Sequence, residues 1–103
     1  MRIVRIVTVL KWRVFQGPSG AWVGVCDQLT LTVQGNTWAE LMGSSVEAVN
    51  LLLNDLAETG EFEQFLRSKD WSTVTPGPAP GEQVQFDLPM VLDLEAREAL
   101  TCK

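Results

Sequence analysis

The arrangement of apolar positions between residues 35 and 60 predicts one long amphipathic helix. Apolar side chains, interrupted by a single serine, recur at helical spacing over about five turns of ~3.6 residues each. The stripe consists of Trp38, Leu41, Met42, Ser45, Val49, Leu52, Leu53 and Leu56. A helix with so apolar a stripe must pack against other parts of the chain.

Both ends of this helix carry local sequence signals. Thr37 and Glu40 form a capping box, in which the Thr37 hydroxyl accepts a hydrogen bond from the N–H of Glu40. The Glu40 carboxylate is expected to accept in return from the N–H of Thr37. Gly60 readily adopts the left-handed conformation in which helices often stop. We therefore expect a helix from Trp38 to about Thr59.

Alternation along residues 2–15 predicts one long β-strand. One parity is almost wholly apolar and makes the better core face: Val4, Ile6, Thr8, Leu10, Trp12 and Val14. The other parity mixes apolar and basic residues: Ile3, Arg5, Val7, Val9, Lys11, Arg13 and Phe15. Such a mixture is typical of a half-exposed sheet face, so we expect the first set to face the helix.

Three shorter strands complete the expected sheet, at residues 21–26, 29–34 and 83–94. A turn containing glycine and proline at residues 16–20 makes a hairpin of the first two strands. Pro89 has no N–H to donate, which places it on an edge or at a strand end. The predicted fold class is therefore α+β, a four-stranded, mainly antiparallel sheet in β-β-β-α-β order with one long helix packed on one face.

The segment between the long helix and the last strand contains a short second helix and a loop. In the run 61–66, Phe62, Phe65 and Leu66 are spaced to pack on one side of a helix. Residues 73–82 hold three prolines and two glycines, which predict a loop.

Composition narrows the range of functions. The chain of 103 residues fits one domain, residues 1–94, with a short tail at 95–103. Its formal net charge of −5 argues against nucleic-acid binding and fits a partner with a basic surface. The chain has no histidine, and Cys26 and Cys102 form no Cys-x-x-Cys motif. We therefore expect no metal site, no cofactor and no histidine-based catalysis. No apolar run approaches the ~20 residues of a membrane span, and no leader segment is evident, so we expect a cytoplasmic protein.

Four segments around the junction of sheet and helix form a recognisable series: 20–27 (GAWVGVCD), 34–37 (QGNT), 39–40 (AE) and 45–53 (SVEAVNLLL). With a last strand at 84–94, this order resembles the HicB-like antitoxin family, whose N-terminal domain is described as a partial RNase H-like fold. The resemblance covers residues 1–94 by order of elements and 20–60 by motif. Leu29-Thr30-Leu31 departs from the Leu-Pro-Gly common in the family. Only nine residues follow Leu94, too few for a helix-turn-helix, so direct DNA binding is not carried over.

The resemblance implies a non-catalytic module that binds and covers a small RNA-cleaving HicA-like toxin. It also implies a homodimer or higher homo-oligomer. Acidic residues around the end of the long helix are the candidates for contact with a basic partner, and their plainer interpretation is a solvated helix end. They are Asp55, Glu58, Glu61 and Glu63. Apolar residues expected on the sheet face away from the helix are the candidates for an oligomer interface. They are Ile3, Val7, Val9, Phe15 and Trp22.

Other interpretations stay open. An orphan homo-oligomeric scaffold, or a domain that binds a small ligand, would need no toxin. Arg5, Lys11 and Arg13 could touch phosphate, although their stems more simply cover apolar surface. Asp27 and Glu47 suggest nuclease carboxylates, although metal-dependent hydrolysis needs several carboxylates that converge. The four tryptophans could stack on RNA bases, although core packing is the simpler interpretation.

Overall fold

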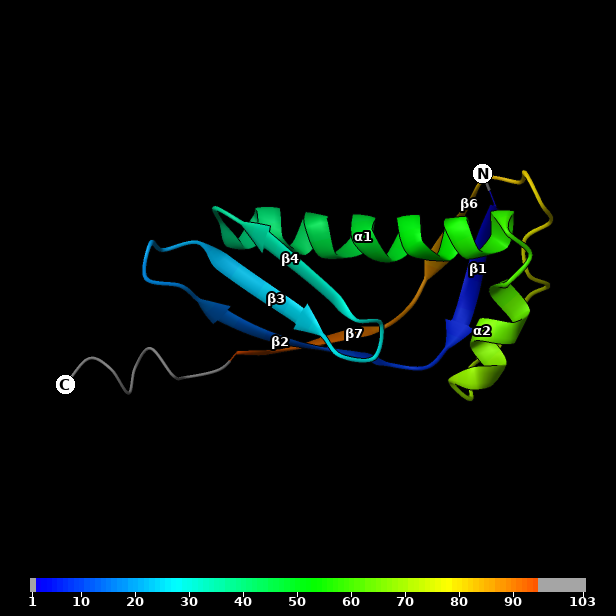
Figure 1. Cartoon of the computed structure of the whole chain (residues 1–103), viewed down its shortest axis with the longest axis horizontal. Helices are drawn as coiled ribbons and strands as arrows, with labels where there is room; N and C mark the ends of the chain where they lie inside the picture. Colours follow the sequence, from blue (N-terminus) through cyan, green and yellow to red (C-terminus); the bar gives the residue numbers. More distant parts are fainter. Residues whose placement is uncertain (1, 95–103) are drawn as a thin grey trace. The chain divides into compact units, whose positions relative to one another are not determined.

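The computed structural model describes residues 2–94, which form two helices and seven strands in two mixed sheets (Figure 1). The strands are β1 (Arg2–Val7), β2 (Leu10–Gln16), β3 (Trp22–Cys26), β4 (Leu31–Gly35), β5 (Ser72–Thr73), β6 (Val84–Asp87) and β7 (Met90–Leu94). The helices are α1 (Trp38–Glu58) and α2 (Phe62–Ser68). The α+β class, the long helix and the short second helix are confirmed. The expected tail at 95–103, with Cys102, lies outside the described residues.

The chain divides into two compact units, each with its own sheet. Unit 1 comprises Met1–Val9 and Val49–Pro89, and unit 2 comprises Leu10–Ala48 and Met90–Lys103. Unit 1 contains the three-stranded sheet in the order β5-β1-β6, and unit 2 the four-stranded sheet in the order β4-β3-β2-β7. The single sheet that we expected is therefore wrong, whereas the boundary of one domain at 1–94 stays a prediction.

Two expected strands are each interrupted, and their pairing explains why. Residues 2–15 form β1 and β2 with a break at Thr8 and Val9, and residues 83–94 form β6 and β7 with a break before Met90. Arg2 pairs with Val84 but Leu10 pairs with Met90, so the sequence separation of partners falls from 82 to 80. One uninterrupted pair of strands cannot hold both registers.

In unit 2, β2, β3 and β4 form an antiparallel meander, and β7 lies parallel to β2. The first part of α1 contacts β3 and β4, as Figure 1 shows. A Cβ atom at Gly24 would lie 3.3 Å from the Trp12 ring and 3.4 Å from a δ-methyl of Leu41. The bare glycine backbone therefore lets the buried Trp12 and Leu41 approach β3 closely.

The junction between β4 and α1 is set by a close backbone approach. A Cβ atom at Gly35 would lie 2.5 Å from the backbone nitrogen of Leu41, so only glycine fits. The N–H of Glu40 donates to Thr37 Oγ1 at 3.1 Å, as predicted. The Glu40 carboxylate accepts from the N–H of Asn36 at 2.9 Å, not from Thr37. Gly35 lies directly against the first turn of α1. The N–H of the next residue, Asn36, therefore comes within hydrogen-bonding distance of the Glu40 carboxylate.

The far end of α1 stops as predicted at Gly60, which has φ 80°. The N–H of Gly60 donates to the carbonyl of Ala57 at 3.2 Å, and the N–H of Glu61 to that of Leu56 at 2.8 Å. This pair of hydrogen bonds is a Schellman motif, which satisfies carbonyls that the helix leaves open.

Unit 1 has a core of its own beneath β1. Val4 and Ile6 of β1 are buried together with side chains from α1, α2 and β6: Val49, Leu53, Ala57, Phe62, Leu66, Val84 and Phe86. Trp71 is also buried and meets Phe65 edge to face, with ring centroids 5.9 Å apart. The predicted core parity of residues 2–15 is confirmed, because the apolar members at 4, 6, 10, 12 and 14 are all buried.

Side chains of α1 cover the outer edge of β6. Asn50 Oδ1 accepts from the N–H of Phe86 at 2.9 Å, and Asn54 Nδ2 donates to the carbonyl of Val84 at 3.3 Å. These hydrogen bonds satisfy backbone groups on the outer edge of β6, which could otherwise pair with a strand of another chain.

Candidate interaction surfaces

The side of the three-stranded sheet opposite the core of unit 1 is here called the outer face. It consists of Ile3, Arg5, Val7, Ser72, Val74, Gln85 and Asp87. Strand alternation places Ile3 and Val7 on this side, with 53% and 55% of their surface exposed. Val74, whose N–H donates to the carbonyl of Arg5 at 3.0 Å, is 65% exposed. The outer face thus combines three exposed apolar side chains with polar and charged ones.

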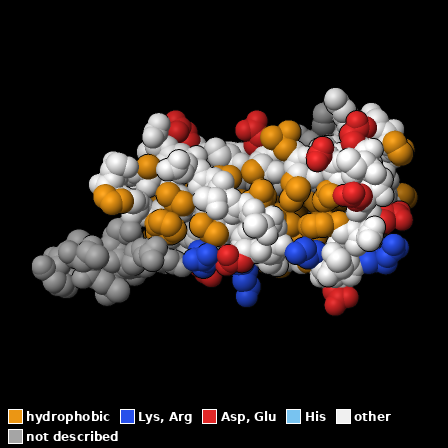
Figure 2. Space-filling view, viewed as in Figure 1, with side chains coloured by type: hydrophobic (Ala, Val, Ile, Leu, Met, Phe, Trp, Pro, Cys, Tyr) orange, Lys and Arg blue, Asp and Glu red, His pale blue; other side chains and the backbone are white. Residues whose placement is uncertain are grey.

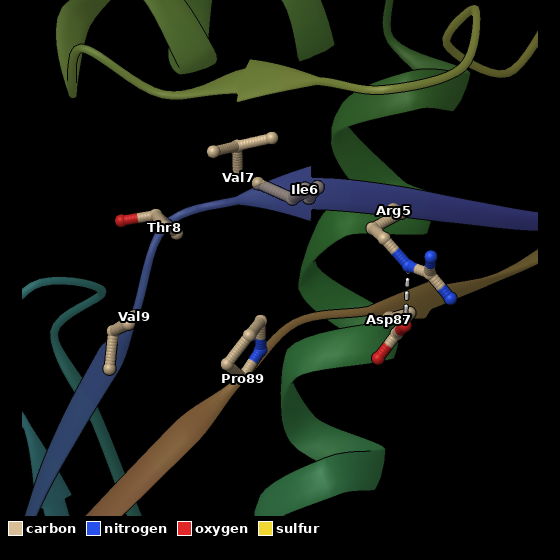
Figure 3. A pocket seen from close by; sticks show the side chains of 7 residues that line it. All are labelled: Arg5, Ile6, Val7, Thr8, Val9, Asp87 and Pro89. Carbon is tan, nitrogen blue, oxygen red and sulfur yellow. Dashed lines mark hydrogen bonds and ion pairs between the residues drawn. The ribbon is translucent and has the colours of Figure 1, made fainter.

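A shallow depression of about 390 Å³ adjoins the outer face. Its lining comprises Arg5, Ile6, Val7, Thr8, Val9, Asp87 and Pro89 (Figure 3). In that view Pro89 lies between Val9 and the Arg5–Asp87 pair. Apart from that pair and the Thr8 hydroxyl, the lining side chains are apolar. This chemistry suits an aliphatic side chain better than a polar ligand.

One ion pair provides the charge of the outer face. Arg5 Nε lies 2.8 Å from Asp87 Oδ2, and 64% and 49% of the two side chains remain exposed. The pair joins neighbouring parallel strands, because Arg5 and Asp87 are register partners. An exposed pair of this kind adds little to the stability of the fold, so both charges remain available to a partner.

Three of the five residues expected at an oligomer interface are exposed, and the interface itself stays a prediction. Ile3, Val7 and Val9 are open to solvent in unit 1. Phe15 is half-buried in unit 2. Trp22 also belongs to unit 2, and its expected position on the side away from the helix is wrong.

The register of the hairpin explains the position of Trp22. Val14 pairs with Gly24 and Gln16 pairs with Trp22, so Trp22 shares the side of the sheet that α1 covers. Its ring meets that of Trp38 edge to face, with centroids 5.1 Å apart and planes at 82°. Trp22 thus holds the start of α1 against the sheet.

The four expected partner-binding carboxylates lie in unit 1. Asp55 and Glu58 lie in the last turn of α1. Glu61 and Glu63 lie on either side of the first residue of α2, and all four carboxylates are exposed. Figure 2 shows several acidic side chains gathered over this end of α1 and α2. None of the four takes part in the ion pairs of residues 2–94.

An exposed leucine lies among these carboxylates. Leu51 is 66% exposed and precedes Asp55 by four residues and Glu58 by seven, so the three side chains share one face of α1. Leu51, Asp55, Glu58, Glu61 and Glu63 are here called the acidic surface. An exposed apolar side chain next to charged ones is a common arrangement at protein interfaces.

The two carboxylates that suggested a nuclease, Asp27 and Glu47, have different surroundings. Asp27 accepts from Arg13 Nε at 3.0 Å and from a second Arg13 nitrogen at 3.1 Å, and these hydrogen bonds lower the pKa of the Asp27 carboxyl below its usual range. Glu47 lies exposed in the middle of α1. Within residues 2–94, no three His, Cys, Asp or Glu side chains cluster closely enough to hold a metal ion. Cys26 is fully buried.

Arg2 fastens the proline-rich loop to the start of β1. Its guanidinium donates to both carboxylate oxygens of Glu82, at 3.0 and 2.9 Å, and to the carbonyls of Pro76 and Gly77. The Glu82 carboxylate also accepts from the N–H of Ala79 at 2.9 Å. Hydrogen bonds from Arg2, and then that from Ala79, lower the pKa of Glu82 to about 2.

Leu51 and Val74 are exposed residues that the sequence did not single out, whereas Pro89 lies at a strand end as predicted. Leu51 carried a usable signal, because it lies at helical spacing from two of the predicted carboxylates. The sequence around Val74 gives no such signal, because the exposure of Val74 depends on how β5 pairs with β1. The lining role of Pro89 likewise depends on where β6 ends.

Comparisons of the chain with family models, with curated proteins and with solved structures each found no match. Among residues 2–94, neither helix combines the length and apolar character needed to cross a membrane.

Proposed function

We propose that the protein is a non-catalytic, antitoxin-like interaction module that binds and covers a small basic RNA-cleaving protein of the HicA-like toxin type. The observation that carries this proposal is the acidic surface. Its four carboxylates are exposed and outside the ion pairs of the described chain, and Asp55 and Glu58 share one face of α1 with the exposed Leu51. In a chain of net charge −5, such a surface attracts and orients a basic partner.

The order of elements in unit 2 gives further support. Three antiparallel strands, β2, β3 and β4, lead through the Gly35 turn and the cap of Thr37 into α1, and β7 returns beside β2. Unit 2 taken alone therefore has a β-β-β-α-β order, although β1, α2, β5 and β6 of unit 1 add to the order that the resemblance implies for residues 1–94.

The test is binding to the product of a small basic reading frame encoded beside this gene. We expect a stable complex in a pull-down and relief of toxicity on co-expression. Glu58→Lys should weaken the complex about tenfold or more, because like charges then face each other across the contact. Asp93→Lys is the matched control, since it makes the same change in net charge at an exposed position in unit 2. Equal losses for both variants, or no complex at all, would remove the proposal.

A homo-oligomeric scaffold without a toxin partner is the second candidate. The open apolar outer face favours it, because contiguous exposed apolar surface usually marks an interaction site. A genome neighbourhood without a small basic reading frame would favour this candidate over the first.

A further inference from the structure

The balance of charge sets the outer face apart from the rest of the surface. The chain carries 13 acidic and 8 basic residues, so two copies have the same net charge and repel each other on average. On the outer face the charges are one arginine and one aspartate, Arg5 and Asp87, which cancel. Repulsion between two copies is therefore small where the open apolar side chains lie.

The same two charges make the face self-complementary. A two-fold contact brings one patch against an identical patch, so a residue of one copy meets a different residue of the other. A face with charges of one sign would repel itself in such a contact. Arg5 and Asp87 supply one charge of each sign on adjacent strands, 2.8 Å apart, and both side chains are about half exposed or more.

We propose that the outer face binds a second copy of the chain through a two-fold contact, in which Arg5 of each copy faces Asp87 of the other. Ile3, Val7 and Val74 then bury their exposed surface against the partner copy. The depression beside Pro89 receives an aliphatic side chain of that copy. This contact goes beyond the proposed toxin binding and does not depend on it.

A second copy fits this face better than a basic protein does. A basic partner is steered toward negative surface, which the acidic surface on α1 and α2 supplies. The outer face has no net charge with which to attract it, whereas two identical neutral faces have no net charge with which to repel each other.

A charge-swap experiment on the purified protein alone tests the proposal. Sedimentation equilibrium should show that the wild type exceeds the mass of one chain, 11.4 kDa, as its concentration rises. Arg5→Glu makes both charges of the face acidic, and Asp87→Arg makes both basic. Each variant alone should associate about tenfold more weakly or worse. An equal mixture should regain association, because an acidic face then meets a basic one.

Arg67→Glu is the matched control, since it makes the same substitution at an exposed position on α2, away from the outer face. It should self-associate like the wild type. Circular dichroism should show both swap variants folded, because the pair is exposed. A wild type of single-chain mass at every concentration overturns the proposal, as does a mixture that fails to associate. Either result leaves the toxin proposal standing, because no toxin is present.

Discussion

The two sides of β1 carry the same kinds of side chain and meet opposite environments. Ile6 is 1% exposed and Ile3 53%, and Val4 is 0% exposed while Val7 is 55%. Side chains from α1, α2 and β6 cover the first side in unit 1, whereas the other remains open. Residue type therefore does not decide burial along this strand. The inner side stabilises the fold, whereas the outer side is exposed.

Shortening each isoleucine in turn tests whether the two sides of β1 differ. Ile6→Ala should lower the free energy of unfolding by about 2–5 kcal/mol, because it leaves a cavity in the core. Ile3→Ala should change it by less than about 0.5 kcal/mol. Urea denaturation at low protein concentration measures both, since self-association at high concentration would add apparent stability. Equal losses would show that the outer side is also covered within the chain.

A smaller effect concerns how the start of β1 is held. The pKa of Glu82 falls in the folded chain from 4.5 to about 2, so its pairing with Arg2 stabilises the fold above about pH 4.5. That contribution should be lost as the pH falls from 4.5 toward 2. Glu82→Gln should lack it, so the difference in melting temperature between wild type and variant should be greatest above pH 4.5 and shrink below it. A difference that stays constant across this range would contradict the role of the ion pair.

The features predicted correctly from the sequence are those with local causes. Thr37 and Glu40 mark the start of α1, and Gly60 marks its end, because capping involves only neighbouring residues. The buried side of residues 2–15 could also be predicted from the sequence, because alternate residues of a strand point to opposite sides. The Glu40 carboxylate reached Asn36 and not Thr37, because Gly35 packs against the first turn of the helix.

The features predicted wrongly depend on pairing between distant segments. Nothing in residues 2–15 shows that Arg2 and Leu10 meet partners with different sequence separations, so the break into β1 and β2 went unseen. The side on which Trp22 lies was also predicted wrongly. The hairpin register pairs Val14 with Gly24, so Trp22 lies on the same side as the buried Val14, and the pattern of β3 alone does not show this.

The candidate surfaces were predictable in part for the same reason. The exposure of Ile3 and Val7 follows from strand parity, and that of Asp55 and Glu58 from their position beside the apolar stripe of α1. The pairing of Arg5 with Asp87 was not predictable, because it needs the parallel register of β1 and β6.

The two isoleucines of the chain, Ile3 and Ile6, allow a direct test, because they lie on opposite sides of β1. NMR of a sample labelled at the isoleucine δ1 methyls gives one signal for each side, and a soluble nitroxide broadens the methyls that solvent reaches. We expect Ile6 to be protected at every concentration, and Ile3 to be broadened in dilute protein and protected in concentrated protein. An Ile3 signal that stays equally broadened up to the highest concentration would contradict the claim that the outer side serves association.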